Sequence, residues 1–253
     1  MFHGDVIRFI GIYVVVGIAF LPDVEPPITE EEEFEPYLPE LEESAPPTDG
    51  PDLLWGRFLD DKIDGRGGDD QSNGYDGDDT LNGSDGNDTV IGGNGDDIVT
   101  VGHDNDLLQG LTGNDELHGA DGNDHLAGGS GHDSLDGGAR SDALIGGQGG
   151  HVRAGGHGSD VLHGNDGSDI MTGGDGADTF VYTDVGDEPI EITDFDPTVD
   201  TMAIQFHEND VRDTSVHPVS EDVYEIRLGD QVAAHVKSTV PFDASSVVVQ
   251  THT

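Results

Sequence analysis

The chain has 253 residues, of which 54 are acidic and nine are Lys or Arg, so its formal net charge is −45. It contains 39 glycines and no cysteine, and apolar and aromatic residues make up only 33% of it. The charge argues against nucleic-acid and acidic-lipid partners, because Lys and Arg bind phosphate groups, and it favours cations as ligands. Without cysteine there are no disulfides, no thiolate zinc sites and no cysteine nucleophile.

Residues 1–21 end in an uncharged apolar run, Phe9–Leu21. A membrane-spanning helix needs about 20 apolar residues, whereas a shorter run such as this one is typical of a signal peptide. The segment Gly17-Ile18-Ala19 supplies the small residues of a cleavage site. Residues 1–21 are therefore interpreted as a signal-like segment. A short anchor that tethers the chain weakly to a membrane and a cytoplasmic β-strand stay open as alternatives.

Residues 22–52 have a different composition from the rest of the chain. They hold eight of the 12 prolines and 12 acidic residues, with no Lys or Arg. Like charges repel, and a segment with so few apolar residues cannot bury a core. The composition predicts a disordered, solvated linker.

A nonapeptide repeat runs from Gly65 to Val181, in thirteen units without an insertion. Position 1 is Gly in twelve units and position 4 is Gly in eleven. Position 8 is apolar in eleven units: Leu81, Val90, Val99, Leu108, Leu117, Leu126, Leu135, Leu144, Leu162, Met171 and Phe180. Position 6 is Asp in twelve units: Asp70, Asp79, Asp88, Asp97, Asp106, Asp115, Asp124, Asp133, Asp142, Asp160, Asp169 and Asp178.

Each unit has the pattern of a turn over positions 1–6 followed by a short strand over positions 7–9. Glycines at positions 1 and 4 permit positive φ and close backbone approach, and position 8 is the one strand residue that faces inward. Two units close one circuit, and successive circuits pair through parallel strands. The repeat is therefore predicted to form a stack of coils with position 8 inside.

Each turn offers main-chain carbonyls and one carboxylate at position 6. Hard oxygen ligands of this kind suit Ca²⁺ better than zinc. Stacking brings the Asp of one unit beside the turn two units later, so we expect coils to share ions and the twelve position-6 Asp residues to be metal ligands. The repeats also crowd 23 acidic residues against three arginines, so folding and ion binding are predicted to be coupled.

These units resemble the G-G-x-G-x-D-x-U-x repeat of the RTX (hemolysin-type calcium-binding) family over nearly half of the chain. The closest matches begin at Gly92 and Gly173. The resemblance implies an all-β fold, a parallel β-roll in the form of a right-handed solenoid, that binds several calcium ions. The roll is assigned to residues 53–181, including a partial leading repeat at Asp61-Lys62-Ile63.

Residues 182–253 are predicted to form a β cap. The strand-like segments 223–228 and 232–236 are separated by Gly229-Asp230 and indicate a hairpin. The stretch that begins at Glu191 resembles the segment after the last repeat of RTX proteins, which implies an uncleaved type I secretion signal near the C-terminus. At the other end, Trp55 and Phe58 are expected to cover the open end of the roll.

Unit ten departs most from the pattern. His151 replaces its Asp, and Arg153 stands at the inward position. An unpaired buried charge costs several kcal/mol, so a local defect is expected there, with weak or empty ion sites shared with units eight and twelve. Val101 and Asp104 in unit five, and Arg140 in unit nine, also break the glycine pattern.

No catalytic motif is found. His207-Glu208 lacks the second His of H-E-x-x-H, and G-x-S-x-G is absent. The expected function is that of a non-enzymatic calcium-binding protein, extracellular or held at the cell surface, which folds on meeting calcium outside the cytoplasm. Two alternatives are a calcium-stabilised adhesion or matrix protein with a cell-surface partner, and an accessory module for a separate secreted enzyme.

Overall fold

The computed structural model describes residues 7–9, 12–14, 46–183, 188–207 and 213–252. The chain divides into two compact units, residues 1–42 and 43–253. In the first unit, β1 (Ile7–Phe9) and β2 (Ile12–Val14) pair antiparallel. Most of the apolar run, and the predicted linker up to residue 45, lie outside the described residues. Among those that are described, no helix is long and apolar enough to cross a membrane.

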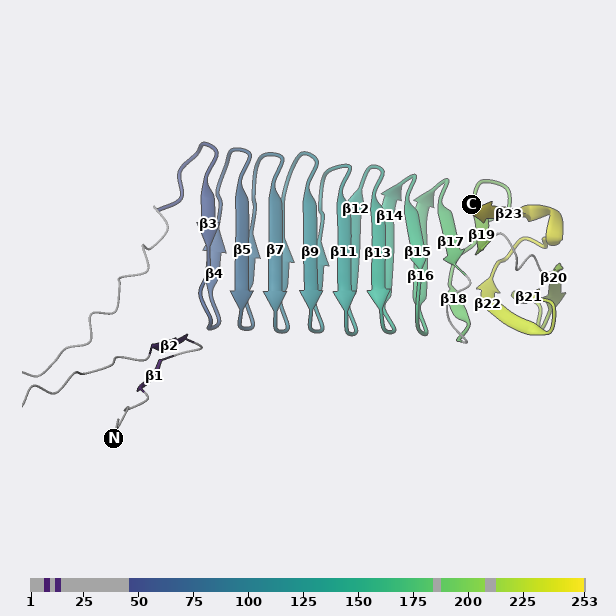
Figure 1. Ribbon diagram of the computed structural model, residues 1–253. Helices are drawn as coiled ribbons and strands as arrows, with labels where there is room; N and C mark the ends of the chain where they lie inside the picture. Colours follow the sequence, from purple (N-terminus) through teal and green to yellow (C-terminus); the bar gives the residue numbers. More distant parts are fainter. Residues whose placement is uncertain (1–6, 10–11, 15–45, 184–187, 208–212, 253) are drawn as a thin grey trace, which may run out of the picture. The chain divides into compact units, whose positions relative to one another are not determined.

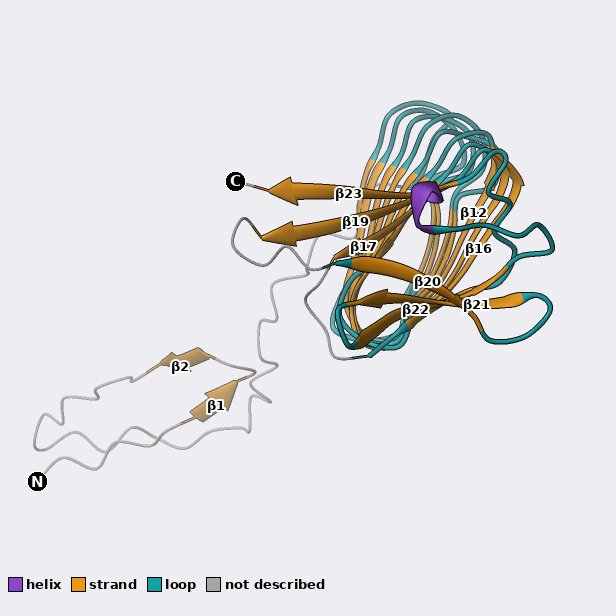
Figure 2. Ribbon diagram, turned by 90° about the vertical axis from the view of Figure 1, so that its right-hand side faces the viewer, coloured by secondary structure: helices purple, strands orange, loops and turns teal. Residues whose placement is uncertain are grey.

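The second unit is a stack of coils whose strands form two sheets (Figure 1, Figure 2). The first, here called the odd sheet, has ten strands in the order β23-β19-β17-β15-β13-β11-β9-β7-β5-β3. Their bounds are β3 (Leu53–Trp55), β5 (Gln71–Asp76), β7 (Thr89–Asn94), β9 (Leu107–Thr112), β11 (His125–Ser130), β13 (Ala143–Gln148), β15 (Val161–Gly164), β17 (Thr179–Thr183), β19 (Thr201–His207) and β23 (Val247–His252).

The second, the even sheet, has eleven strands in the order β20-β21-β22-β18-β16-β14-β12-β10-β8-β6-β4. Their bounds are β4 (Lys62–Asp64), β6 (Thr80–Asn82), β8 (Ile98–Thr100), β10 (Glu116–His118), β12 (Ser134–Ala139), β14 (Val152–Gly158), β16 (Ile170–Gly176), β18 (Ile190–Ile192), β20 (Thr214–Pro218), β21 (Val223–Leu228) and β22 (Gln231–Lys237). The described residues contain no α-helix, only the 3₁₀ turn η1 (Ala244–Ser246).

Within the repeats, successive strands of each sheet pair parallel and in register, two repeat units apart. Leu81 lies opposite Val99, and Leu108 lies opposite Leu126. Because the register never slips within the repeats, position 8 of each unit faces the interior, and all eleven apolar residues there are at most 1% exposed. The predicted all-β parallel roll of two-unit coils is confirmed.

The glycines at positions 1 and 4 have different roles, and of these two positions only position 4 has the expected positive φ. Positive φ occurs at positions 2 and 4 of the units, and none of the position-1 glycines has it. Position 2 holds this conformation even where it is not Gly, as at Leu111 (φ 81°). Most position-1 glycines are needed for space instead, because a Cβ there would overlap the carboxylate of the same unit. The expected positive φ at position 1 was therefore wrong.

The C-terminal cap continues both sheets. β22 pairs parallel with β18, β21 and β20 add antiparallel strands, and β23 pairs parallel with β19. β21 and β22 form the predicted hairpin, with Gly229 at positive φ in its turn. Phe195 contacts Phe180 of the last repeat at 6.1 Å and Phe242 at 5.1 Å between ring centroids. Aromatic packing thus covers the C-terminal end of the roll.

The N-terminal end of the roll is different. Trp55 and Phe58 expose 48% and 64% of their surface, so within the described residues they do not cover this end as expected. Leu54 takes the inward position instead. The first coil also includes Asp52, which the sequence placed in the linker. Its N–H donates to Asp70 Oδ1 at 2.8 Å.

Candidate metal centre

The twelve position-6 Asp residues form two columns, one along each edge of the roll. Each stands at the end of a turn, just before the strand of its own unit. The column that precedes strands of the even sheet, here called the even column, contains Asp79, Asp97, Asp115, Asp133 and Asp169. All twelve residues are at most 3% exposed. Carboxylates are almost never buried without partners, so this arrangement calls for a source of positive charge.

One oxygen of each carboxylate ties neighbouring coils together. The N–H of Asp97 donates to Asp115 Oδ1 at 2.9 Å, and the N–H of Asp124 donates to Asp142 Oδ1 at 2.8 Å. Eleven of the twelve residues accept such a bond from the Asp two units earlier. The twelfth, Asp169, accepts from the N–H of His151 at 3.0 Å. The main chain thus satisfies Oδ1 throughout both columns.

The second oxygen of each carboxylate has no hydrogen-bond partner. Oδ2 of all twelve residues is buried and makes no hydrogen bond within the protein. An unsatisfied buried charged oxygen costs more than the roughly 1–3 kcal/mol of a neutral polar group. Twelve repeats of the same orphaned atom identify a place built for a ligand that the polypeptide itself does not supply.

The missing side chain of the position-1 glycine opens the space beside this oxygen. At Gly74 a Cβ would overlap both Asp79 Oδ2 and the carbonyl oxygen of Gly92, two units later. The same pair of atoms converges at Gly110, where Asp115 Oδ2 meets the Gly128 carbonyl. A carboxylate of one coil and a carbonyl of the next therefore form a cradle of oxygens.

The chemistry of this cradle fits calcium. Ca²⁺ takes six to eight oxygen ligands, and carbonyls serve as well as carboxylates. No group of three or more His, Cys, Asp or Glu side chains suited to a metal is found in the described part of the chain. A cradle in this part of the chain therefore has fewer than three such side chains and depends on main-chain carbonyls for the remaining ligands, which suits calcium better than zinc.

Burial changes the acidity of these groups when no cation is bound. Desolvation raises the pKa of Asp97, Asp106 and Asp142 to about 7, and repulsion from neighbouring Asp residues adds to the shift. The pKa values of Asp115 and Asp124 rise to about 6, again through desolvation. A bound divalent cation would favour the ionised carboxylates, because it supplies the opposite charge.

Asp52, Asp61 and Asp200 extend the columns at their ends, and sequence reasoning did not single them out as site residues. Oδ1 of Asp200 accepts from the N–H of Asp178 at 3.0 Å, as inside the roll. Oδ2, however, is satisfied by protein in all three, through the N–H groups of Thr48, Arg57 and Asp196. Counting back in nines from Asp70 reaches Asp61, which the partial leading repeat already included, and then Asp52. Asp200 does not lie a whole number of repeat units after Asp178, so the period could not reveal it.

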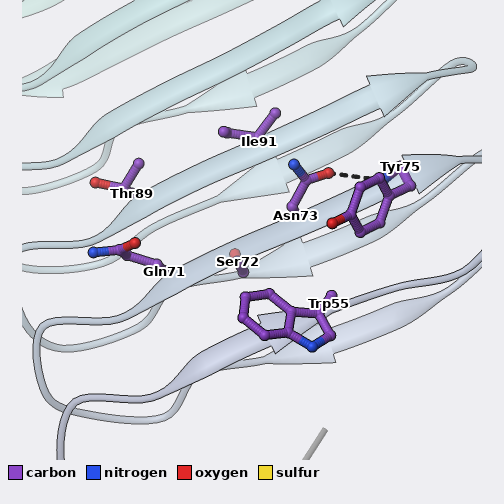
Figure 3. A pocket seen from close by; sticks show the side chains of 7 residues that line it. All are labelled: Trp55, Gln71, Ser72, Asn73, Tyr75, Thr89 and Ile91. Atoms are coloured by element: carbon purple, nitrogen blue, oxygen red, sulfur yellow. Dashed lines mark hydrogen bonds between the residues drawn. The ribbon is translucent and has the colours of Figure 1, made fainter. Parts of the chain in front are cut away.

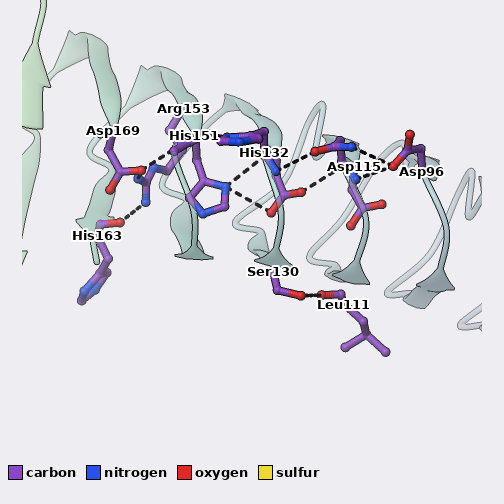
Figure 4. A network of polar contacts seen from close by, with 12 residues as sticks. Asp96, Leu111, Asp115, Ser130, His132, His151, Arg153, His163 and Asp169 are labelled. Atoms are coloured by element: carbon purple, nitrogen blue, oxygen red, sulfur yellow. Dashed lines mark hydrogen bonds and ion pairs between the residues drawn. The ribbon is translucent and has the colours of Figure 1, made fainter. Parts of the chain in front are cut away.

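Unit ten keeps the register of the roll, although three of its buried nitrogens, His151 Nε2 and Arg153 Nε and Nη2, make no hydrogen bond with the described residues. Leu135, Arg153 and Met171 pair in register, so the strands continue through it. Arg153 is fully buried, with Nη2 2.6 Å from Asp169 Oδ1 and Nη1 donating to the carbonyl of His163 (Figure 4). Burial lowers the pKa of Arg153, and the Asp169 carboxylate opposes that shift. The prediction of an unpaired charge was wrong, because the partner lies on the adjacent coil.

The outer face of the odd sheet carries a shallow hollow of about 180 Å³ between the first coils (Figure 3). Trp55 and Tyr75, both 48% exposed, line it together with Gln71, Asn73 and Ile91. None of the residues that line it is acidic or basic. The hollow offers aromatic and amide groups to a surface ligand and lies on the opposite side of the strand from the interior.

A parallel β-roll with columns of buried carboxylates beside glycine-opened carbonyls defines a class of calcium-binding solenoids. Comparison with known families finds the RTX calcium-binding nonapeptide repeat at residues 48–81, 73–108, 102–135, 128–150 and 154–182. These matches cover more than half of the chain, which therefore belongs to this family. No curated protein matches the chain. The family matches omit residues 151–153, where unit ten departs from the pattern.

Proposed function

We propose that this protein is a secreted or cell-surface-held, non-enzymatic calcium-binding protein whose roll folds when it meets Ca²⁺ outside the cytoplasm. Calcium binding follows from membership of the repeat family. The observation that carries the rest of the proposal is the set of twelve buried Oδ2 atoms without hydrogen bonds. Such a roll is costly to form until cations neutralise it, so binding and folding become one event.

The proposed location follows from the difference in calcium concentration between the cytoplasm and the extracellular space. Extracellular calcium-binding modules work at roughly 10⁻⁴–10⁻³ M, well above the range of cytosolic sensors. A chain whose folded state depends on such concentrations stays unfolded before export and folds after it. A non-enzymatic role is proposed because the roll and its cap take up the described residues from 46 to 252.

A calcium titration followed by far-UV circular dichroism tests the proposal. In chelator we expect little β signal, and on addition of calcium a cooperative rise to a β-rich spectrum. Magnesium should substitute poorly, because it dehydrates reluctantly and demands a smaller octahedral site. An equal β signal in chelator and in millimolar calcium would contradict the proposal. The location is tested separately, by assaying culture medium and the cell surface for the full chain.

A second candidate function, adhesion, has one observation in its favour. The half-exposed rings of Trp55 and Tyr75 both line one hollow whose exposed surface is mainly apolar, an arrangement suited to stacking against a surface ligand (Figure 3). In this case calcium would only stiffen the roll that displays them. Replacing both rings by Ala would then abolish attachment to a surface while leaving the calcium titration unchanged.

A further inference from the structure

The even column of carboxylates is interrupted in unit ten. His151 takes the place of the Asp, and its Nδ1 accepts the N–H of Asp133 at 3.1 Å. A neutral imidazole that accepts this bond has no proton on Nδ1 to give to Asp133 Oδ2, 3.1 Å away. Unit ten therefore has no carboxylate at position 6. His151 replaces only the acceptor that such a carboxylate would offer to the N–H of Asp133.

Arg153 brings a fixed positive charge to the same place. A Cβ added at Gly128 would overlap Asp133 Oδ2 and the Gly146 carbonyl, as in the other cradles. A Cβ added at Gly146, the corresponding glycine of unit ten, would instead overlap the His151 ring and Nη1 of Arg153. The guanidinium therefore lies where the ion cradle of unit ten would be.

The guanidinium also contacts the groups that face it from the next coil. Asp169 Oδ1 lies 2.6 Å from Nη2, and the carbonyl of His163 accepts from Nη1 (Figure 4). A carboxylate and a carbonyl are the same two kinds of oxygen that converge in the other cradles. Among the described residues, Arg153 is the one Lys or Arg paired with a position-6 Asp, and ten of the twelve have no ion pair with any basic side chain.

We propose that Arg153 is a built-in cation that replaces Ca²⁺ in unit ten and pairs with Asp169. The inference rests on the proposed calcium binding and refines it. Arginine keeps its charge at any physiological pH and in any calcium concentration. In the folded roll, the contact between units ten and twelve therefore needs no calcium ion of its own, and the even column holds fewer ions than an unbroken series of consensus units would.

The experiment counts calcium ions bound per full-length chain at saturation, by native mass spectrometry. The double variant His151→Asp/Arg153→Leu rebuilds the consensus unit and should bind at least one ion more than the parent. His151→Asp alone should add none, because the guanidinium still fills the cradle. If Arg153 had only a packing role, the restored Asp would recruit calcium by itself, and a gain in this single variant would overturn the proposal.

Arg140→Gly is the matched control, since it also removes a basic residue from the repeat and restores the consensus. Arg140 is exposed and has no ion pair among the described residues, so the ion count should stay at the parental value.

An equal ion count in the parent and the double variant would also refute the proposal that Arg153 replaces a calcium ion. A parent that binds no calcium at all would instead contradict the proposed function, so the two failures are distinguishable.

A second readout covers the case in which a variant folds poorly. The dependence of the thermal midpoint on calcium concentration reports how many ions folding takes up. Its slope should be steeper for the double variant than for the parent, and unchanged for Arg140→Gly. Parallel slopes for all three proteins would refute the proposal even if their absolute stabilities differ.

Discussion

Asp115 receives a 2.9 Å hydrogen bond at Oδ1 from the N–H of Asp97, while its Oδ2 is buried without a partner. One side chain therefore has two roles. Through Oδ1 it holds two coils in register, and through Oδ2 it offers a ligand to a cation. Without a cation, the buried charge at Oδ2 destabilises the same fold that the hydrogen bond to Oδ1 stabilises.

Position 6 should differ sharply from the solvent-facing positions. Asp124→Ala removes both a proposed ion ligand and the acceptor of the Asp106 N–H, a bond to a charged group worth about 1.5–3 kcal/mol. Asp136→Ala, on the exposed face of β12, removes one negative charge and neither feature. We expect the calcium midpoint to rise several-fold for Asp124→Ala and hardly for Asp136→Ala, measured by circular dichroism. Similar shifts would show that only the total charge matters.

The ion-free roll should become more stable in acid. Burial raises the pKa of Asp97, Asp106 and Asp142 from an ordinary value of 3.8 to about 7. A carboxyl whose pKa is higher in the folded state binds protons preferentially there, so the stability of the ion-free roll falls as pH rises from about 4 to about 7. In chelator, the β signal measured by circular dichroism should therefore increase from pH 8 to pH 5.5. A signal that stays flat or falls over this range would contradict the burial of these carboxyls in the ion-free roll.

With calcium present, the same carboxyls give the opposite dependence. Protons compete with the cation for Oδ2, so the calcium midpoint should rise as the pH falls from 8 to 5.5. Circular dichroism titrations at both pH values measure it. A midpoint independent of pH would mean that the buried carboxyls do not bind the ion.

Gly119→Ala should destabilise the calcium-loaded roll, whereas Ala120→Gly, at the next residue, should stabilise it. At Gly119 a Cβ would overlap the Gly137 carbonyl and Asp124 Oδ2, so Gly119→Ala should close the cradle and destabilise the calcium-loaded roll. Ala120 has φ 67°, a left-handed conformation that costs an L-residue roughly 1–2 kcal/mol. Ala120→Gly should raise the thermal midpoint in calcium, and a fall in both variants would contradict this interpretation of the turn.

The cap should carry much of the apolar stabilisation. Phe195 is 2% exposed and contacts the rings of Phe180 and Phe242. Truncating a buried Phe to Ala costs about 3–5 kcal/mol, and we expect that loss for Phe195→Ala in chemical denaturation with calcium. Val199→Ala, in the same segment but 52% exposed, is the control and should change stability by less than about 0.5 kcal/mol.

The sequence predicted the features that its period repeats. Because each unit is followed by a similar one two units later, the inward place of Leu117 and the burial of Asp124 follow from position alone. Features that depend on three-dimensional neighbours were not visible. The partner of Arg153 lies on another coil, at a different repeat position, and the contact of Phe195 with Phe242 forms in a segment without a period.

Turn geometry was the other gap. Gly at position 1 and Gly at position 2 look alike in a sequence, although one is required for space and the other for its φ angle. Only the backbone shows which is which, since Leu111 and Ala120 tolerate position 2 while a Cβ at Gly119 would overlap the carboxylate of its own unit.

The two-unit register also restricts how such a gene can grow or shrink. Loss of a single nonapeptide would transfer every later strand to the opposite sheet and exchange the two outer faces. β18 and β19 would then arrive on the wrong sides, and the cap could not seat on the last repeat. Loss or duplication of two nonapeptides leaves both faces and the cap unchanged. Viable changes in length during evolution therefore come in whole coils.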